Sequence, residues 1–444
     1  MRWISVVFFL ICHATAQSSV YSSQEQNRLE SYWSQNMLKN GAIVASPSTE
    51  HPDYYYDWVR DSAIAMGLIS KRYQNEQRLT DKKRLLHYVD WVMLTQNQVS
   101  PHGVDVLGEP KFYITGQVYV GAWGRPQNDG PALRAMALIG FANALLTRGE
   151  SEYVGKHLYQ RSLDPSTMGV IKKDLEYTAH HWQEANFDLW EEVYGQHFFT
   201  AMVQHRALVD GAKLANRLND PEAANFYSQQ AQAIKQQLSN HLNPSTGLID
   251  ATLSPHPGPQ KLNELDSAVL LGVLLTLGDD NVIELDNAYL KNTIESLHDY
   301  FKQAFPINHS LQHAILFGRY PGDTYDGYQT DGQGNPWFIL TATMAEYYYA
   351  YAYQIANQQG ACQQAEEMAK LGDSYLRLVK RFAPQLRMNE QIHLSTGVQQ
   401  GADSLTWSYT AVLRAIDAER NYENLIASSS RKLHYHKMGA LIDI

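Results

Sequence analysis

Two adjacent carboxylates, Glu191 and Glu192, follow Trp190 and precede an apolar segment with helical periodicity. Neighbouring like charges and burial both raise the pKa of a carboxyl group. A carboxyl that keeps its proton near neutral pH is what general acid catalysis requires. The alternative is an acidic first turn, where the two charges only complement a helix dipole. This stretch alone leaves both interpretations open.

A second carboxylate of interest is Glu390, in the sequence Met388-Asn389-Glu390-Gln391. Hydrolysis of a glycosidic bond uses two carboxyl groups, of which one protonates the leaving oxygen and the other assists water or attacks directly. Most glutamates lie on protein surfaces and do no chemistry. Glu191 and Glu390 therefore form a candidate pair only if the fold brings their loops together.

The elements that must position these residues are almost all helical. Segments with one polar face lie at 24–38, 81–98, 169–182, 220–239, 287–304 and 361–382. They alternate with segments that are apolar or small on most sides, at 61–73, 130–147, 197–217, 265–277, 336–355 and 404–417. Amphipathic helices cover a surface, and helices that are apolar all round are buried. The alternation predicts an all-α fold, an (α/α)6 barrel with six outer and six inner helices.

Five of the expected inner helices follow loops dense in Trp, Arg, Asp, Glu and Gly, at 52–61, 108–134, 187–195, 317–337 and 387–407. If the inner helices run parallel, these loops meet at one rim of the barrel. Loops held by a rigid scaffold are where chemistry usually takes place. The sixth loop, before Leu265, is rich in proline and carries no comparable cluster.

Composition and the chain start limit the remaining possibilities. A net charge of −10 argues against nucleic acid or an anionic membrane as the partner. Residues 1–16 have the pattern of a signal peptide, with cleavage expected after Ala16 and export of the remaining chain. Cleavage would remove Cys12 and leave Cys362 as a structural thiol. We expect residues 17–444 to form a single catalytic domain that acts as a monomer.

Ten short motifs resemble the glucoamylases of glycoside hydrolase family 15, in family order from about residue 21 to 425. They are Ala45-Ser46-Pro47-Ser48, Pro52-Asp53-Tyr54-Tyr55-Tyr56, Trp58-Val59-Arg60-Asp61-Ser62, Leu107-Gly108-Glu109-Pro110-Lys111-Phe112, the run from Trp123 to Arg134, the run from Asp188 to Glu192, the run from Gly318 to Tyr325, Gly334-Asn335-Pro336-Trp337-Phe338, Asn389-Glu390-Gln391 and Leu405-Thr406-Trp407-Ser408-Tyr409.

The resemblance implies an exo-acting, inverting hydrolase that releases β-glucose from non-reducing ends of α-1,4-linked glucans. By resemblance Glu191 is the general acid and Glu390 the general base. Inverting enzymes hold these carboxyl groups roughly 6.5–9.5 Å apart, which leaves room for a water molecule. We expect a separation in that range, one proton held by Glu191, and a bell-shaped, acidic pH profile.

Other matched residues are expected to bind the sugar. By resemblance Arg60 and Asp61 hold the 4- and 6-hydroxyls of the terminal glucose, and Arg319 reads the 2- and 3-hydroxyls. Asp323 is expected to hold Arg319, Glu192 to bind the next sugar, and Gln391 to position the base or its water. The expected apolar and aromatic contacts are Tyr54, Trp58, Tyr119, Trp123, Leu189, Trp190, Trp337 and Trp407.

Several points stay open. Val59 and Asp57 depart from the family pattern beside the expected pocket, and nothing resembles an appended starch-binding domain. We expect no cofactor and no metal: Asp323, Asp326 and Asp331 lack the spacing of a calcium loop. The alternatives are a related barrel glycosidase, such as a glucodextranase or trehalase, and a non-catalytic glucan-binding protein. The sequon at Asn308 matters only in a host that glycosylates.

Overall fold

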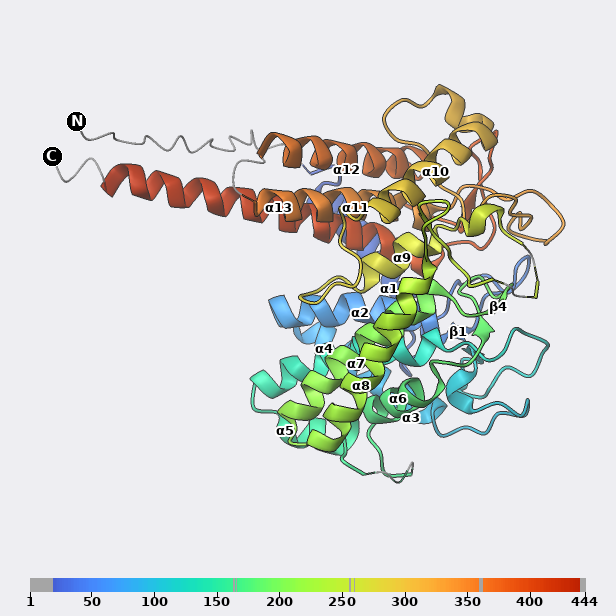
Figure 1. The fold of residues 1–444 in the computed structure, drawn as a ribbon, viewed down its shortest axis with the longest axis vertical. Coiled ribbons are helices and arrows are strands. Elements are labelled where there is room, and N and C mark those ends of the chain that lie inside the picture. The colour runs from blue at the N-terminus through green and yellow to red at the C-terminus, as the bar shows by residue number, and fades with distance from the viewer. Residues whose placement is uncertain are drawn as a thin grey trace.

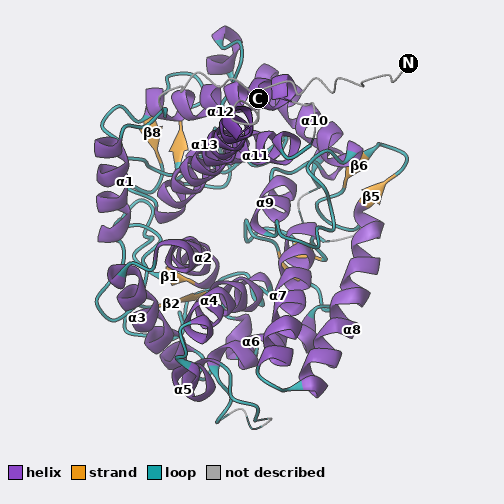
Figure 2. Ribbon diagram, turned by 90° about the vertical axis from the view of Figure 1, so that its left-hand side faces the viewer, coloured by secondary structure: helices purple, strands orange, loops and turns teal. Residues whose placement is uncertain are grey.

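The structure is a computed structural model that describes residues 19–439 except 163, 165, 255, 256, 259 and 359–361. Two concentric rings of helices form the molecule (Figure 2). The outer ring is α1 (Ser23–Gln35), α3 (Leu79–Thr95), α6 (Val170–His181), α8 (Pro221–Leu238), α10 (Ala288–Ala304) and α12 (Cys362–Phe382). The inner ring is α2 (Val59–Glu76), α4 (Asp129–Thr147), α7 (Phe198–Arg217), α9 (Ala268–Leu275), α11 (Phe338–Ala356) and α13 (Thr406–Gly439). The predicted (α/α)6 barrel is confirmed.

The remaining elements are short. Helix α5 covers Ser151–Tyr153, a π-turn covers Val154–Leu158, and 3-10 turns lie at Val106–Gly108, Ser239–His241, Leu262–Glu264 and Pro306–Ser310. Four antiparallel two-stranded ladders pair β1 (Asp57–Trp58) with β2 (Lys111–Phe112), β3 (Asn186–Phe187) with β4 (Tyr194–Gly195), β5 (Leu242–Asn243) with β6 (Leu248–Ile249), and β7 (Gln391–Ile392) with β8 (Gln399–Gln400).

Burial explains the two kinds of helix. Helix α4 is apolar on most sides and its residues are largely buried, as expected of an inner helix. Among the described helices it alone has the length and apolar composition to cross a bilayer, yet it packs between α2 and α7. Three outer helices, α1, α8 and α10, start with side-chain caps. The Asp220 side chain accepts from Ala223 N ahead of Pro221 in α8, and Ser22 and Glu25 form a capping box in α1.

The inner helices run in one direction, so their first turns meet at one end of the barrel. The long loops and the β-ladders lie at that end, on the right of Figure 1. Helix α9 breaks the regularity, because it has 8 residues where α2 has 18. Ten fewer residues shorten it by about 15 Å at 1.5 Å per residue.

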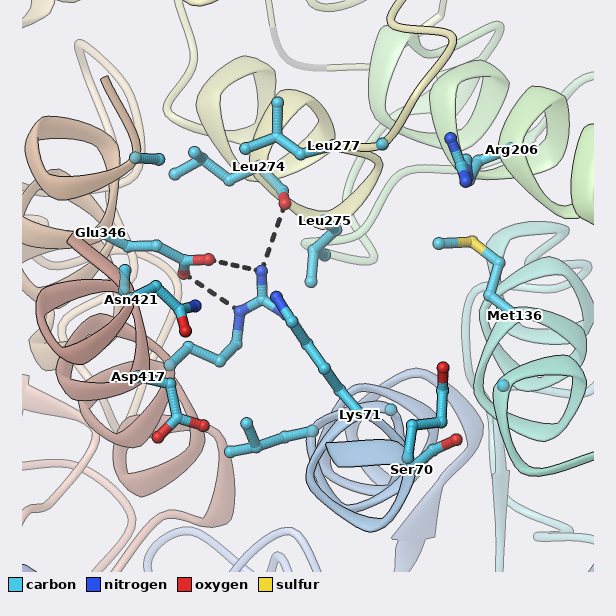
Figure 3. Close-up of a pocket in the computed structure, with 18 of the residues that line it drawn as sticks. Ser70, Lys71, Met136, Arg206, Leu274, Leu275, Leu277, Glu346, Asp417 and Asn421 are labelled. Atoms are coloured by element: carbon cyan, nitrogen blue, oxygen red, sulfur yellow. Dashed lines mark hydrogen bonds and ion pairs between the residues drawn. The ribbon is translucent and has the colours of Figure 1, made fainter. Parts of the chain in front are cut away.

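A large cavity of about 1210 Å³ opens at the other end, among the C-terminal parts of the inner helices where α9 stops short. Figure 3 shows its lining, with Lys71 from α2 and Glu346 from α11 pointing inward. The guanidinium of Arg414 binds Glu346 at 2.6 and 3.0 Å and the Leu274 carbonyl, the last turn of α9, at 3.2 Å. Arg414 therefore donates a hydrogen bond to a carbonyl group in the last turn of α9, which has no partner within the helix.

Three details differ from the sequence expectations or lie beyond them. The last inner helix was expected to end at residue 417, but α13 continues to Gly439. Cys362 was expected to remain a thiol but is disulfide-bonded; the one other cysteine of the sequence, Cys12, and the expected leader lie outside the described residues. The sequon residue Asn308 is fully buried, and its amide donates to Phe301 O and Leu316 O, so the folded chain hides it.

Candidate active site

A cavity of about 300 Å³ lies at the end of the barrel where the inner helices begin. All but three of the residues predicted for the site line it: Tyr54, Trp58, Arg60, Asp61, Trp123, Leu189, Trp190, Glu191, Glu192, Arg319, Trp337, Glu390 and Trp407. Glu191 and Glu390 thus face one cavity although their loops are far apart in the sequence. The cavity has the size of a small-molecule site and polar groups placed among apolar walls.

Glu191 is presented by a strained turn between β3 and β4. Its backbone has φ 69°, in the left-handed region that few non-glycine residues adopt. Asp188 holds the turn, because its Oδ1 accepts from the backbone N–H groups of Glu192 and Val193 at 2.8 and 2.9 Å, and its carbonyl accepts from Glu191 N. Such strain persists only where the surroundings enforce it.

Lys261 stabilises this turn by binding Asp188. Its ammonium binds Asp188 at 3.3 Å and Asp266 at 2.5 Å, and all three side chains are buried. Burial alone would raise the pKa of Asp188, but the charge of Lys261 holds it below its usual range. Asp266 also accepts from Trp190 Nε1 at 2.9 Å. The loop before α9 was expected to carry no comparable cluster; instead it supplies the ion pairs that fix the Glu191 turn.

The two oxygens of Glu191 have different surroundings. Oε1 accepts from three donors, Trp58 Nε1 at 2.9 Å, Arg60 Nη2 at 3.1 Å and Gln127 Nε2 at 3.1 Å. Among the described residues, Oε2 accepts only from Trp123 Nε1, at 2.8 Å. Oε1 is therefore saturated as an acceptor, and a transferable proton on Glu191 has room only on Oε2.

Glu390 lies one residue before β7, with 1 % of its surface exposed. Gly401, at φ 74°, makes room for it, because a Cβ at this position would stand 2.4 Å from Glu390 Oε2. The hydroxyl of Tyr325 donates to the same oxygen at 3.2 Å and shares a 2.8 Å hydrogen bond with the hydroxyl of Tyr54. The ring of Tyr325 packs on Trp337 with ring centroids 6.2 Å apart.

Burial raises the pKa of Glu390 to about 8, while the two tyrosine hydroxyls and the charge of Arg319 oppose that rise. Burial therefore favours the protonated form of Glu390 near neutral pH. This differs from the expectation that Glu390 is the ionised member of the pair. The cause is its nearly complete removal from water, which the sequence does not reveal.

Arg60 lies beside Asp61 in the first turn of α2, and one of its buried nitrogen atoms has no hydrogen-bond partner among the described residues. Arg60 Nη1 binds Asp129 at 2.9 Å and Gln127 at 3.0 Å, but its Nε has no partner among the described residues and lies 4.0 Å from Asp61 Oδ2. Burial raises the pKa of Asp61 to about 7, against the attraction of Arg60. Unpaired buried groups cost free energy unless a ligand binds them. This corner is suited to hydroxyl groups.

Arg319 forms the opposite polar corner. Its guanidinium contacts Asp323 at 2.5 and 2.9 Å and Glu192 at 2.8 Å. Tyr320 donates to the other oxygen of Glu192. Burial raises the pKa of Glu192, although the charge of Arg319 opposes this. The expected contact between Asp323 and Arg319 is present, and it places Asp323 behind Arg319 and outside the cavity.

Aromatic side chains form the walls. Trp190 stacks on Trp407 with ring centroids 6.4 Å apart and packs at 5.6 Å on Trp337. All three are buried, whereas Trp123 is 36 % exposed and stands at the rim. Trp337 Nε1 is a second buried donor without a partner among the described residues. Flat apolar faces with a few unpaired polar groups are suited to a sugar ring.

The other two predicted residues outside the cavity are Tyr119 and Gln391. Tyr119 packs at the back of Trp123, with ring centroids 6.0 Å apart. Gln391 is fully buried, and its side-chain oxygen accepts from Asn335 at 3.0 Å, so it supports the loop that carries Glu390. The departures Asp57 and Val59 do not line the cavity either. Asp57 accepts from Ile43 N at 2.7 Å, and Val59 packs at Gly130.

Sequence reasoning missed several residues that the site uses. Tyr325 donates a hydrogen bond to Glu390, and Gln127 donates one to Glu191. Two lysines bind neighbours of Glu191: Lys261 pairs with Asp188, and Lys111 contacts the ring of Trp123. Tyr325, Gln127 and Lys111 lie inside motifs that resemble the family, so their position in a motif could have indicated a role in the site. Lys261 lies in no such motif, and nothing in the sequence indicated its role. Within the described part of the chain, no three His, Cys, Asp or Glu residues are placed to hold a metal ion.

Fold and site together define a barrel glycoside hydrolase with two carboxyl groups in one cavity. A family model described as "Glycosyl hydrolases family 15" matches residues 29–417, and the chain belongs to that family. A probable glucoamylase of Schizosaccharomyces pombe is 36 % identical over 408 residues, covering 85 % of each chain.

Solved structures agree with this assignment. A glucoamylase from Saccharomycopsis fibuligera superposes with a TM-score of 0.81 at 30 % identity, over 90 % of this chain and 95 % of that one. A family 15 glucoamylase from Hypocrea jecorina gives 0.80 at 27 % identity, over 90 % and 72 %. The predicted family is confirmed.

Proposed function

We propose that this enzyme releases β-glucose from the non-reducing ends of α-1,4-linked glucans, with Glu191 as the general acid and Glu390 as the general base. The observation that carries the proposal is that both glutamates line one small cavity together with Arg60, Asp61 and Arg319. Membership of the family supports the hydrolase activity and the glucan substrate.

The polar corner formed by Arg60 and Asp61 supports binding of a terminal sugar. The unpaired Arg60 Nε and the neighbouring Asp61 carboxyl group would hold the 4- and 6-hydroxyls. Arg319, already oriented by Asp323, would bind the 2- and 3-hydroxyls with its planar fork. A chain end is then the only part of a glucan that satisfies this corner, which supports exo action.

The donors on Glu191 support its role as the acid. Because Oε1 accepts three hydrogen bonds, the proton for the glycosidic oxygen would come from Oε2, beside Trp123 at the rim. Loss of the proton leaves an anion that four donors already stabilise, at no cost of reorganisation. The leaving sugar would lie against Trp123.

Glu390 would then take a proton from the water that attacks the anomeric carbon from the other side. We expect the two carboxyl groups to be roughly 6.5–9.5 Å apart, as inversion requires. The hydroxyls of Tyr325 and Tyr54 would stabilise the ionised form of Glu390 against the effect of burial.

The test compares Glu191→Gln and Glu390→Gln on maltose, isomaltose and trehalose, with the released anomer followed by NMR. Glu184→Gln is the matched control, because Glu184 is an exposed glutamate just before the same hairpin. We expect β-glucose from maltose, losses of about 10²–10⁴-fold in either catalytic variant, and no loss in the control. Initial release of α-glucose, or unchanged turnover in either variant, would refute the proposal.

The raised pKa of Glu390 favours one rival assignment, in which Glu390 is the acid and Glu191 the base. The rival predicts that Glu390→Gln, rather than Glu191→Gln, spares substrates whose leaving group needs no proton. Comparing both variants on maltose and on α-glucosyl fluoride separates the two assignments.

We also propose that the enzyme is exported and acts as a monomer, with its leader removed after Ala16. The net charge of −10 and the pattern of residues 1–16 support this. Light scattering of the purified protein at several concentrations tests the monomer: a mass that rises toward twice that of the single processed chain would contradict it.

A further inference from the structure

Lys111 is a buried cation enclosed by aromatic rings. Only 2 % of its surface is exposed, and its Nζ lies 3.4 Å from the ring centroid of Trp123, 3.9 Å from Tyr119, 4.4 Å from Trp58 and 4.7 Å from Tyr56. Within the described chain its ammonium forms no ion pair or hydrogen bond with another side chain, so the ring faces are its main compensation.

The backbone fixes this arrangement. Lys111 in β2 pairs directly with Trp58 in β1, so the two side chains leave the ladder on the same face. Tyr56 precedes that strand, and Tyr119 and Trp123 follow β2 on the loop that returns over it. The rings contact one another edge to face, Trp58 on Trp123 at 5.9 Å and Tyr119 on Trp123 at 6.0 Å. The cage is therefore one packed unit.

Two members of the cage hold Glu191. Trp58 donates its indole N–H to Oε1 at 2.9 Å, and Trp123 donates its indole N–H to Oε2 at 2.8 Å. The faces of these same two indoles contact the Lys111 ammonium. A cation on an indole face draws electron density from the ring, which makes the N–H a stronger hydrogen-bond donor. Lys111 thus acts on both oxygens of Glu191 without touching either.

We propose that Lys111 is a positioning residue for Glu191: its charge orients and polarises the two indoles that bind the carboxyl group of the acid. A buried charge with no carboxylate partner is expensive, and an apolar residue of similar size would fill the same space without that cost. The charge is then retained for its effect on Glu191. This inference rests on the proposed role of Glu191 as the general acid.

The surroundings of the cage set its dependence on pH. Desolvation lowers the pKa of Lys111 to about 8, and the charge of Arg125 adds to this, while Glu191 and Asp53 oppose it. Arg125 itself pairs with Glu109 and donates to the Tyr119 carbonyl, and Asp53 accepts from the Tyr56 hydroxyl. As the pH rises through about 8, the ammonium becomes a neutral amine and the cage loses its charge.

The experiment compares Lys111→Met with wild type on maltose, whose leaving group needs a proton, and on α-glucosyl fluoride, whose leaving group does not. Methionine fills the cage, and its sulfur packs well on aromatic rings. We expect kcat on maltose to fall about tenfold or more, and kcat on the fluoride to change much less. Lys111→Arg keeps the charge and is expected to retain the wild-type ratio of the two substrates. Lys83→Met, at an exposed lysine of α3, is the control and should change neither.

Two outcomes overturn the inference: equal loss on both substrates in Lys111→Met, as a merely structural role predicts, or no loss on either. If Lys111→Met does not fold, Lys111→Gln is the second neutral variant, judged by the same ratio. Glu191→Gln is measured alongside. If it does not itself distinguish the two substrates, the role of Glu191 fails; if it does and Lys111→Met does not, only the inference on Lys111 fails.

Discussion

The hydroxyl of Tyr325 tests how the cavity controls Glu390. It donates to Glu390 Oε2 at 3.2 Å, and burial of that carboxyl raises its pKa to about 8. A hydrogen bond to a charged group contributes about 1.5–3 kcal/mol, and one pKa unit corresponds to 1.36 kcal/mol. Because 3.2 Å is long for an O–H···O bond, Tyr325→Phe should raise the pKa of Glu390 by about one unit.

The assay is the pH dependence of kcat/KM for maltose. Its acid limb reports the base of the free enzyme, which works only when ionised. A raised pKa therefore moves the acid limb to higher pH by about one unit and leaves the alkaline limb in place. Tyr328→Phe, at an exposed tyrosine of the same loop, should move neither limb. An unchanged acid limb in Tyr325→Phe, or a shift to lower pH, would refute the reasoning.

Three further predictions concern stability, substrate form and processing. Lys261→Met leaves Asp188 and Asp266 buried without their cation. It should lower the free energy of unfolding, measured in urea, by about 3–5 kcal/mol. Lys213→Met, which removes an exposed ion pair, should change that free energy little, and equal losses in the two variants would contradict the account. Soluble dextrin should be hydrolysed faster than granular starch, because the described residues form the barrel and its loops; comparable rates on gelatinised and granular starch would oppose this. Mass spectrometry of the exported protein should place the new N-terminus directly after Ala16, and an intact Met1 would count against export through a cleaved leader.

The helical architecture was predictable because burial leaves a periodic mark on the sequence. Each of the twelve expected helices is present, and all but one lie within about three residues of their expected bounds. The small difference at the start of α9 has a tertiary cause, since Asp266 and Ser267 precede the helix and bind Lys261 and the Gly318 carbonyl. The one large difference is at the C-terminal end of α13. Helix α13 is longer, and its sequence beyond Ser428 gave no apolar stripe to reveal that.

The composition of the site was predictable from motifs, but its electrostatics were not. That Glu191 and Glu390 share a cavity followed from two loops at the starts of parallel helices. The surroundings of each carboxyl group depend on side chains from other loops, and Arg60, Trp58 and Trp123 reach Glu191 only in the folded protein. Sequence spacing carries no information on such contacts between distant loops.

Supporting residues were the least predictable. Lys261 comes from a proline-rich loop with no motif, yet it pairs with Asp188 beneath the catalytic turn. Lys111 lies inside a quoted motif, but nothing in the sequence shows that it stands among four rings. Both are buried cations, whereas most lysines in proteins lie on the surface, so a sequence alone gives no reason to expect them inside.

The assignment of acid and base depends on the leaving group, and one comparison tests it directly. Maltose needs a proton on its leaving oxygen, whereas fluoride departs from α-glucosyl fluoride without one. Both substrates still need a base to activate water. Steady-state kcat of Glu191→Gln and Glu390→Gln on the two substrates therefore separates the roles of the two carboxyl groups.

We predict that Glu191→Gln loses about 10²–10⁴-fold on maltose and retains most of its activity on α-glucosyl fluoride. Glu390→Gln should lose activity on both substrates by similar factors. The opposite pattern, with the fluoride spared in Glu390→Gln and lost in Glu191→Gln, would contradict the account.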